Sequence, residues 1–188
     1  MISVFHICPA RSDKNLGKAI NDIVKVLPDD SWICLRDIDT IPLDHVSFIR
    51  QCEDIAKANE YGLVSCMTNR LGLPWQLIYG EIQPENQINM INEVDVAKNK
   101  AYKYGSTVEE SPREVAGVMM LFPKSVWLEV GGFKEGGIIW GNQMLDNIFY
   151  EAVKAKGHKV GLAKGIYLFH LYRFGKNPRS KAGKSHLK

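Results

Sequence analysis

The first 36 residues alternate two short apolar runs with one amphipathic stretch, and this alternation restricts the fold more than any other feature. Residues 2–8 are β-branched and apolar up to Pro9, and residues 32–35 form a second apolar run. Between them, apolar residues recur at helical spacing: Leu16, Ile20, Ile23, Val24 and Leu27. A strand, a helix capped by Ser12 or Asp13, and a second strand predict a βαβ unit. The fold class expected is α/β with a mainly parallel central sheet flanked by helices.

The rest of the chain continues this alternation, with one long interruption. Further strands are expected at residues 63–66, 115–122, 158–162 and 166–171, and further helices at 44–59, 125–130 and 142–156. Residues 67–114 contain several glycines, prolines and aromatic residues without a clear period. Long irregular stretches inside a compact domain are usually functional or disordered, and the aromatic residues favour a binding role.

Charge is distributed unevenly along the chain. The 188 residues carry a formal charge of +3, which excludes a strongly basic nucleic-acid protein, and 45% of them are hydrophobic, as in soluble globular domains. The first 151 residues are acidic, with 21 Asp and Glu against 14 Lys and Arg, whereas the last 37 carry ten basic residues and no acidic one. Such a basic segment either faces an anion, such as phosphate, nucleic acid or anionic lipid, or serves as a solvated tail.

The cysteines and the N-terminus indicate a reducing compartment. The four cysteines form no CxxC pair, and Cys8, Cys34 and Cys66 lie in apolar runs. We expect these three to be buried and reduced, as in a cytosolic protein. The first residues are too short a run, and lack a basic flank, for a signal peptide or a membrane helix.

Two aspartates, Asp37 and Asp39, follow directly after the second apolar run. Ligands of open α/β sheets bind beyond the carboxyl ends of strands. Two neighbouring carboxylates repel each other unless a proton or a cation separates them, and Mg²⁺ or Mn²⁺ takes oxygen ligands that it shares with phosphates. The alternative is a pair of solvated turn residues. A DxDxT phosphatase motif is excluded, because Thr40 comes one position too early.

Four further blocks have a recognisable order and spacing. They are Pro9-Ala10-Arg11, Ala116 to Lys124 followed by Gly131-Gly132-Phe133, then Trp140-Gly141 with Leu145-Asp146, and Gly157-His158-Lys159-Val160 followed by His170. With the aspartate pair, these blocks resemble the metal-dependent glycosyltransferases of the GT-A fold, of the family 2 and β-1,4-galactosyltransferase type, with a shortened N-terminal half. The resemblance covers most of residues 1–12, 31–42 and 115–175.

The resemblance implies a division of the chain into functional parts. A single Rossmann-like domain would span residues 1–175. Within it, residues 1–66 would form the nucleotide and metal half, 67–114 irregular acceptor-side loops, and 115–175 the acceptor and catalytic half. Residues 176–188 would form a basic flexible tail.

The resemblance also implies an activity and a cofactor. The expected reaction moves a hexose from a nucleotide-diphospho-sugar, with a UDP-sugar as the expected donor, to an acceptor hydroxyl with inversion. Asp37, Asp39 and His170 would hold Mn²⁺ or Mg²⁺. The donor would contact Pro9, Arg11, Arg36, Asp37, Asp39, Arg173 and Lys176. The acceptor would contact Trp75, Gly132, Trp140 and Leu145.

Asp146 is the expected general base in this scheme. It lies at the start of an amphipathic stretch, where the helix dipole also favours a carboxylate for purely structural reasons. His170 ends an apolar run, so a structural role is its alternative.

The expected partners are the nucleotide-sugar and a glycan or glycolipid acceptor, with no specific nucleic acid. The expected location is the cytoplasm, with contact between the basic tail and the inner face of a membrane. Two other functions stay open. Leu145 replaces an expected Glu, which fits a catalytically weak module that only binds a sugar or nucleotide. The basic tail fits an interaction protein that docks on membranes or nucleic acid.

Overall fold

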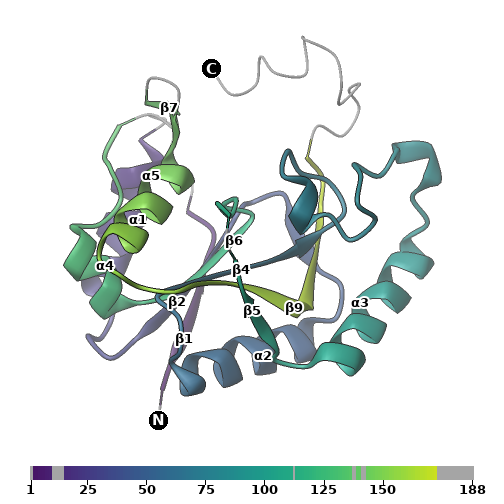
Figure 1. The fold of residues 1–188 in the computed structure, drawn as a ribbon, viewed down its shortest axis with the longest axis horizontal. Helices are drawn as coiled ribbons and strands as arrows, with labels where there is room; N and C mark the ends of the chain where they lie inside the picture. The colour runs from purple at the N-terminus through teal and green to yellow at the C-terminus, as the bar shows by residue number, and fades with distance from the viewer. Residues whose placement is uncertain (1, 10–14, 112, 137–138, 141–142, 173–188) are drawn as a thin grey trace.

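The computed structural model describes residues 2–9, 15–111, 113–136, 139–140 and 143–172, which form an α/β structure around one central sheet (Figure 1). Its strands are β1 (Val4–Ile7), β2 (Trp32–Arg36), β3 (Thr40–Pro42), β4 (Leu63–Thr68), β5 (Val108–Glu110), β6 (Met119–Pro123) and β9 (Val160–His170). Its helices are α1 (Leu16–Val26), α2 (His45–Ala58), α3 (Met90–Tyr104), α4 (Lys124–Val130) and α5 (Leu145–Ala155), with the 3₁₀ turns η1 (Pro74–Gln76) and η2 (Glu85–Gln87). A separate hairpin pairs β7 (Ile139–Trp140) with β8 (Gln143–Met144).

The sheet is mixed, so the predicted α/β class is confirmed and the mainly parallel arrangement only in part. In the described part of the chain its order is β1-β2-β6-β4-β9-β3, with β5 paired to β9. The pairs β1–β2 and β4–β9 are parallel, whereas β6 is antiparallel to β2 and β4, and β3 and β5 are antiparallel to β9. An apolar run indicates a buried strand, but it gives neither the direction of the strand nor its neighbours. The antiparallel placement of β6 between β2 and β4 could therefore not be predicted from its sequence.

These pairings give β1, β2, β4 and β9 the same direction. Their carboxyl ends therefore lie at one edge of the sheet, where the chain continues into Asp37 after β2 and Asn69 after β4, and where His170 ends β9. We call this the carboxyl edge. Because β6 and β3 run the other way, they begin at this edge, with Gly117 shortly before β6 and Thr40 at the start of β3.

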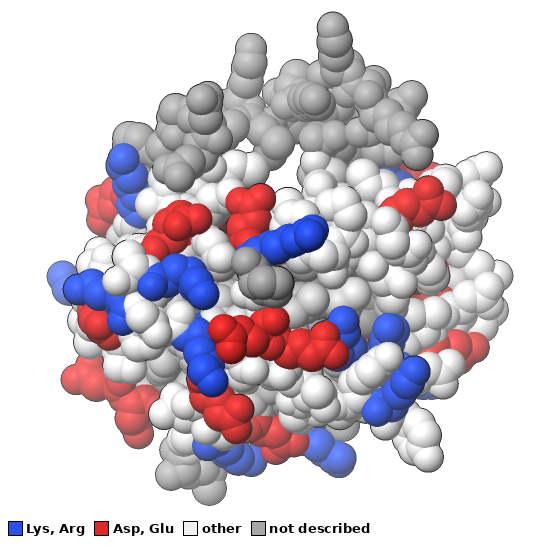
Figure 2. All heavy atoms as spheres, in the orientation of Figure 1, with Lys and Arg blue, Asp and Glu red and all other residues white. Residues whose placement is uncertain are grey.

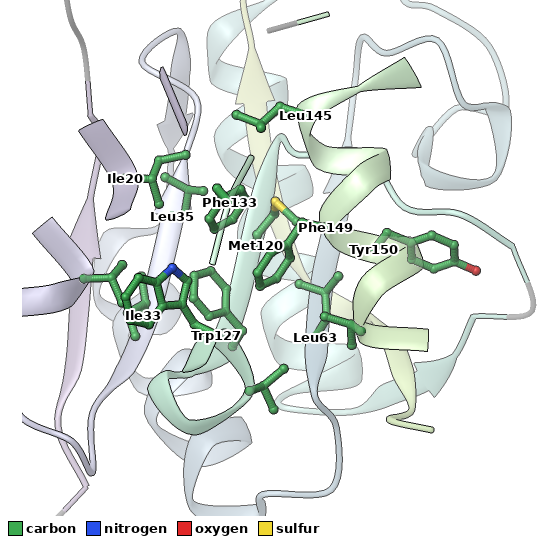
Figure 3. Packing of buried hydrophobic residues seen from close by; sticks show 14 of the residues in the cluster. Ile20, Ile33, Leu35, Leu63, Met120, Trp127, Phe133, Leu145, Phe149 and Tyr150 are labelled. Atoms are coloured by element: carbon green, nitrogen blue, oxygen red, sulfur yellow. The ribbon is translucent and has the colours of Figure 1, made fainter. Parts of the chain in front are cut away.

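Alternating side chains of β2 divide the core between the two faces of the sheet. Ile33 and Leu35 pack with residues of α1, α4 and α5, while Trp32 and Cys34 pack with residues of α2. Figure 3 shows the first of these clusters, in which the Phe133 and Phe149 rings, among others, fill the space under α5. Burial on both faces explains why the first four residues of β2, Trp32 to Leu35, are all apolar.

The helix ends confirm one predicted cap and replace another. The Asp44 side chain accepts a hydrogen bond from the backbone N–H of Ser47 and caps α2, as expected. Helix α1 begins at Leu16, and Asn15 rather than Ser12 or Asp13 caps it. Those two predicted caps lie outside the described residues.

The prediction of irregular loops over residues 67–114 is wrong for its second half, which contains α3 and β5. Helix α3 buries only Glu93 and Ala97, so it lacks the apolar stripe by which helices are recognised. Its N-terminus is capped by Asn89, whose side chain accepts from the backbone of Ile91 and Asn92. Polar contacts rather than apolar periodicity hold this helix on the sheet.

The two strands predicted at residues 158–162 and 166–171 are one strand, β9. Its pairing with β4 shifts register between Cys66, which pairs with Ala163, and Met67, which pairs with Tyr167. Gly165 lies in this irregular segment, where a Cβ atom would lie 2.0 Å from the carbonyl oxygen of Gly105. Glycine at position 165 therefore allows the backbone of β9 to lie against the backbone at Gly105 without interrupting the strand.

Burial of the cysteines differs from expectation in part. Cys34 and Cys66 are buried free thiols as predicted, but Cys8 is exposed because it lies beyond the end of β1. On the face seen in Figure 2, acidic and basic side chains of the described residues are interspersed. Among the described residues, no helix combines the length and apolar character needed to cross a membrane.

Candidate metal centre

Three side chains at the carboxyl edge could hold a metal ion. Asp37, Asp39 and His170 each offer one ligand atom, and these atoms all lie within 4.8 Å of one another. The ligands of an octahedral Mg²⁺ with bonds of about 2.1 Å lie roughly 3–4 Å apart, so small side-chain movements would suffice to close the site. Two predicted ligands from the turn after β2 and one from the end of β9 are thus brought together.

A turn between β2 and β3 positions the two aspartates. The Thr40 N–H and hydroxyl both donate to the Asp37 carbonyl, at 3.2 and 2.7 Å. The Arg36 guanidinium donates to the Thr40 carbonyl at 3.3 Å and lies over the Phe48 ring. Arg36 therefore supports the turn, and its expected contact with the donor stays a prediction.

Strand β3 connects this turn to the end of β9. Thr40 pairs with His170 in the antiparallel ladder, and the Leu171 N–H donates to the Asp39 carbonyl at 3.0 Å. This pairing brings His170 beside Asp39. His170 Nε2 lies 3.2 Å from Asp39 Oδ1, and the histidine side chain is only 4% exposed.

The other ring nitrogen of His170 has a fixed partner. Its Nδ1 lies 2.9 Å from the carbonyl oxygen of Arg70. Because a carbonyl can only accept, this contact places the hydrogen on Nδ1 and, in the neutral ring, leaves the Nε2 lone pair directed at Asp39. Metal-binding histidines commonly donate their second N–H to a carbonyl in this manner.

The two aspartates have different electrostatic environments. Asp37 is exposed to solvent, yet the protein around it partly desolvates its carboxyl and raises its pKa to about 7. The charge of His170 opposes this shift, while the charges of Asp39 and Asp146 add to it. When the His170 ring carries a hydrogen on Nε2 as well, its hydrogen bond to Asp39 lowers the pKa of that carboxyl, against a smaller raising effect of burial. A cation between the carboxylates would relieve the repulsion that Asp37 experiences.

Asp146 lies near enough to this cluster to affect the titration of Asp37. It is the second residue of α5, and its carboxylate accepts backbone N–H groups of Gly117 at 2.7 Å and Asn147 at 3.0 Å. Burial raises its pKa, and the two N–H groups oppose that shift. At Gly117 a Cβ would lie 2.9 Å from the Asp146 Cβ, so glycine is needed for this approach.

The backbone connects the candidate base to the aspartate pair. The Asp37 N–H donates to the Val118 carbonyl at 3.4 Å, one residue after Gly117. Two consecutive residues before β6 therefore make these contacts: Gly117 binds Asp146, and Val118 binds Asp37. This connection explains how α5, far along the chain, presents a carboxylate beside the turn after β2.

Trp75 lies on the Asp146 side of the site. Its indole N–H donates to the Glu114 carbonyl at 2.9 Å, and the Arg113 guanidinium lies 5.2 Å from its ring centroid. The Glu114 carboxylate in turn accepts from the Asn147 side chain at 2.8 Å. The half-buried Trp75 is thereby joined to the first turn of α5, next to Asp146.

Two residues that are predicted to contact the acceptor have packing roles. Leu145 is 4% exposed and belongs to the core cluster shown in Figure 3. Gly132 follows α4 with a φ of +78°, and a Cβ there would lie 2.8 Å from Asn21 Oδ1. Both positions are therefore explained by the core and by the end of α4.

The remaining predicted contacts are located less fully. Pro9 follows β1, two residues beyond Ile7, which pairs with Leu35, so it lies at the carboxyl edge near Asp37. Arg11, Arg173 and Lys176 lie outside the described residues, as does the side chain of Trp140.

Sequence reasoning missed three residues that organise the site: Asn69, Arg70 and Gly117. Asn69 and Arg70 follow the buried strand β4, just as Asp37 follows β2. Polar residues directly after a buried strand are the signal that could have identified them. Gly117 was part of a noted motif, but its contact with Asp146 depends on tertiary structure.

The donor atoms fit a hard divalent cation. Carboxylate oxygens suit both Mg²⁺ and Mn²⁺, and the single imidazole ligand favours Mn²⁺. No protein-family model matches the chain, and no curated protein matches its sequence. The chemistry of these side chains is therefore the basis for assigning a function.

Proposed function

We propose that this protein is a metal-dependent glycosyltransferase that moves a hexose from a nucleotide-diphospho-sugar to an acceptor hydroxyl. One observation carries the proposal: the ligand atoms of Asp37, Asp39 and His170 converge at the carboxyl edge, with the Asp146 carboxylate close enough to interact with Asp37. The sequence blocks that resemble GT-A glycosyltransferases support the same assignment, and a UDP-sugar is the proposed donor.

Asp37, Asp39 and His170 would hold Mn²⁺ or Mg²⁺. When bound, such a cation supplies positive charge that offsets the negative charge of the departing diphosphate. The protein's own contribution is positioning. The Thr40 contacts hold the aspartate turn, and the Arg70 carbonyl directs the free nitrogen of His170 to the same point.

Asp146 is the proposed general base. A base must reach the proton of the acceptor hydroxyl, and its pKa should approach the working pH. The Gly117 and Asn147 N–H groups orient the Asp146 carboxylate, while burial raises its pKa. Direct attack by the acceptor oxygen would invert the anomeric centre, with the proton transferred to Asp146.

The acceptor is proposed to approach from the side of Trp75. The indole N–H donates to the Glu114 carbonyl, and the Glu114 carboxylate accepts from Asn147 in the first turn of α5, so Glu114 links the aromatic residue to the helix that carries the base. Sugar rings pack well on such aromatic faces. A glycan or glycolipid at the cytoplasmic side of a membrane is the proposed acceptor, with the basic C-terminal residues contacting the donor or the lipid.

A ligand panel tests the function. Ligands that bind only the folded state raise its apparent stability. In a panel of UDP-, GDP- and CMP-sugars, we expect a UDP-sugar to raise the melting temperature only when Mn²⁺ is present, and product release to stop on addition of EDTA. The Asp39→Asn variant should lose the Mn²⁺-dependent shift, whereas Asp95→Asn, an exposed carboxylate of α3, should keep it.

Two outcomes would contradict the enzyme. Ligand binding without transfer or hydrolysis across the whole panel would indicate a binding module. An equal Mn²⁺ response in Asp39→Asn and wild type would show that the cation binds elsewhere. Separately, loss of liposome affinity on removal of residues 176–188, with activity intact, would assign the basic tail to docking.

A further inference from the structure

Arg70 is a fully buried arginine directly behind the candidate metal centre. Its side chain is 0% exposed and its three guanidinium nitrogens each have a partner. Nε donates to the Tyr172 carbonyl at 2.8 Å, Nη1 to the Gln83 carbonyl at 2.7 Å, and Nη2 to a Glu85 carboxylate oxygen at 3.3 Å. A buried guanidinium with this many partners holds the segments around it in one arrangement.

The same residue contacts the end of β9 twice. Its side chain binds the carbonyl of Tyr172, two residues after His170, and its own carbonyl accepts from the His170 ring. Its neighbour Asn69, also 0% exposed, accepts the His170 backbone N–H at 2.8 Å. Asn69 is in turn fixed by its side-chain amide, which donates to Gln83 at 3.1 Å. The loop after β4 therefore holds both the backbone and the ring of His170.

In its neutral form, the ring of His170 experiences two opposed demands. The Arg70 carbonyl requires a hydrogen on Nδ1, while the Asp39 carboxylate, 3.2 Å from Nε2, favours a hydrogen on Nε2. A neutral imidazole carries only one hydrogen, so the two acceptors compete for its tautomer. Only the tautomer that Arg70 favours keeps the Nε2 lone pair available for a cation.

We propose that Arg70 is a positioning residue of the metal centre, which holds His170 in the tautomer and orientation that can bind a divalent cation. This inference rests on the proposed function, because it assumes that Asp37, Asp39 and His170 bind a metal. It assigns to the buried arginine an effect transmitted through its own carbonyl, without contact with donor or acceptor.

The test compares two buried cations of the same protein. Lys124, 4% exposed, also binds backbone carbonyls, but it does so at the opposite edge of the sheet. Arg70→Lys keeps a positive charge but cannot reach all three acceptors, and Arg70→Met removes the contacts with the Tyr172 and Gln83 carbonyls and the Glu85 carboxylate. Lys124→Met is the matched control, since it also removes a buried cation. Two quantities are measured: Mn²⁺ affinity by electron paramagnetic resonance, and the ¹⁵N shifts of the His170 ring in the metal-free proteins.

We expect both Arg70 variants to bind Mn²⁺ about 10- to 100-fold more weakly, the usual cost of losing the partner of a metal-binding histidine. The neutral His170 ring should change from hydrogen on Nδ1 to hydrogen on Nε2. Lys124→Met should lower stability and leave both quantities as in wild type.

The outcomes separate this inference from the proposed function. Wild type that binds no Mn²⁺ would overturn the proposed function and, with it, the metal-positioning role. Wild type that binds, together with Arg70→Lys of equal affinity and unchanged tautomer, would overturn only the role of Arg70. An equal loss of affinity in Lys124→Met would attribute the effect to general destabilisation and would also overturn it. If Arg70→Met does not fold, Arg70→Lys decides.

Discussion

The two edges of the sheet differ in how their charged side chains are paired: carboxylates gather near one another at the carboxyl edge, whereas a buried cation has acceptors around it at the opposite edge. At the carboxyl edge, Asp37, Asp39 and Asp146 lie near one another, and Asp37 has a pKa raised to about 7. At the opposite edge, the buried Lys124 ammonium donates to the carbonyls of Lys25 and Leu27 at the end of α1, and lies 2.9 Å from an Asp29 carboxylate oxygen.

The contrast separates a stabilising arrangement from the one proposed to be functional. A cation at a helix C-terminus binds carbonyls that have no other intrahelical partner and interacts favourably with the helix dipole. Carboxylates of the same sign close together have the reverse effect, and such local conflicts persist in proteins mainly where a ligand resolves them. We infer that the edge at Lys124 contributes to folding and that the carboxyl edge is organised for a cation.

The largest effect is expected when a carboxylate is removed from the carboxyl edge, and it is an effect on turnover. Asp146→Asn should reduce turnover about 10²- to 10⁴-fold, the usual contribution of a general base, because the amide cannot accept the proton. The matched control at the opposite edge is Asp29→Asn, whose side chain is 91% exposed, and it should keep wild-type turnover. Steady-state kinetics at saturating donor measure both, and equal turnover in Asp146→Asn and wild type would remove the base assignment.

An intermediate effect is expected on stability at the edge of Lys124. Lys124→Met leaves the carbonyls of Lys25 and Leu27 without this donor, which should lower the free energy of unfolding by about 1–3 kcal/mol. Urea unfolding followed by circular dichroism measures the change. An unchanged free energy of unfolding would mean that water replaces the ammonium at no cost. Lys124 would then not stabilise the fold, contrary to the proposed difference between the two edges.

The smallest effect is a gain in stability when the carboxyl edge loses a charge. The pKa of Asp37 is raised from 3.8 to about 7 in the folded protein, so the folded state binds the proton more tightly than the unfolded state. The stabilisation from this proton is complete below about pH 4 and is lost as pH rises towards and through 7. Because Asp37 is exposed and solvent screens its charge, the effect is small, and Asp37→Asn should melt slightly above wild type at pH 8 without metal.

The same comparison at pH 4 supplies the control, because there wild-type Asp37 is itself protonated and the two proteins should have similar melting temperatures. Added Mn²⁺ at pH 8 should stabilise wild type and not the variant. A variant that melts below wild type at pH 8 would show that Asp37 is not under electrostatic strain.

Several parts of the site could be predicted from the sequence for definite reasons. Asp37 and Asp39 follow an apolar run, and apolar runs predict strands whose ends expose polar side chains. Asp146 lies at the start of the amphipathic α5, where its position was predictable to within a turn, although the helix begins at Leu145 rather than at the expected residue 142.

Other parts could not be predicted because their partners are distant in sequence. Arg70 carries no local sign of its three acceptors, and an arginine in an irregular stretch normally suggests solvent. Helix α3 buries the Glu93 carboxylate, which accepts from Gln83 and from the hydroxyls of Tyr79 and Tyr167. A polar inner face of this kind removes the apolar period on which helix prediction depends.

The amino-acid sequence by itself determined which segments are buried, where strands end, and which of those ends have carboxylates or a histidine. Only the tertiary structure decided that β6 lies antiparallel between β2 and β4, that β3 pairs with the end of β9, and that Arg70 lies behind His170. The physical reason is that burial leaves a periodic pattern within each segment, whereas strand order, direction and register depend on contacts between segments far apart in the chain.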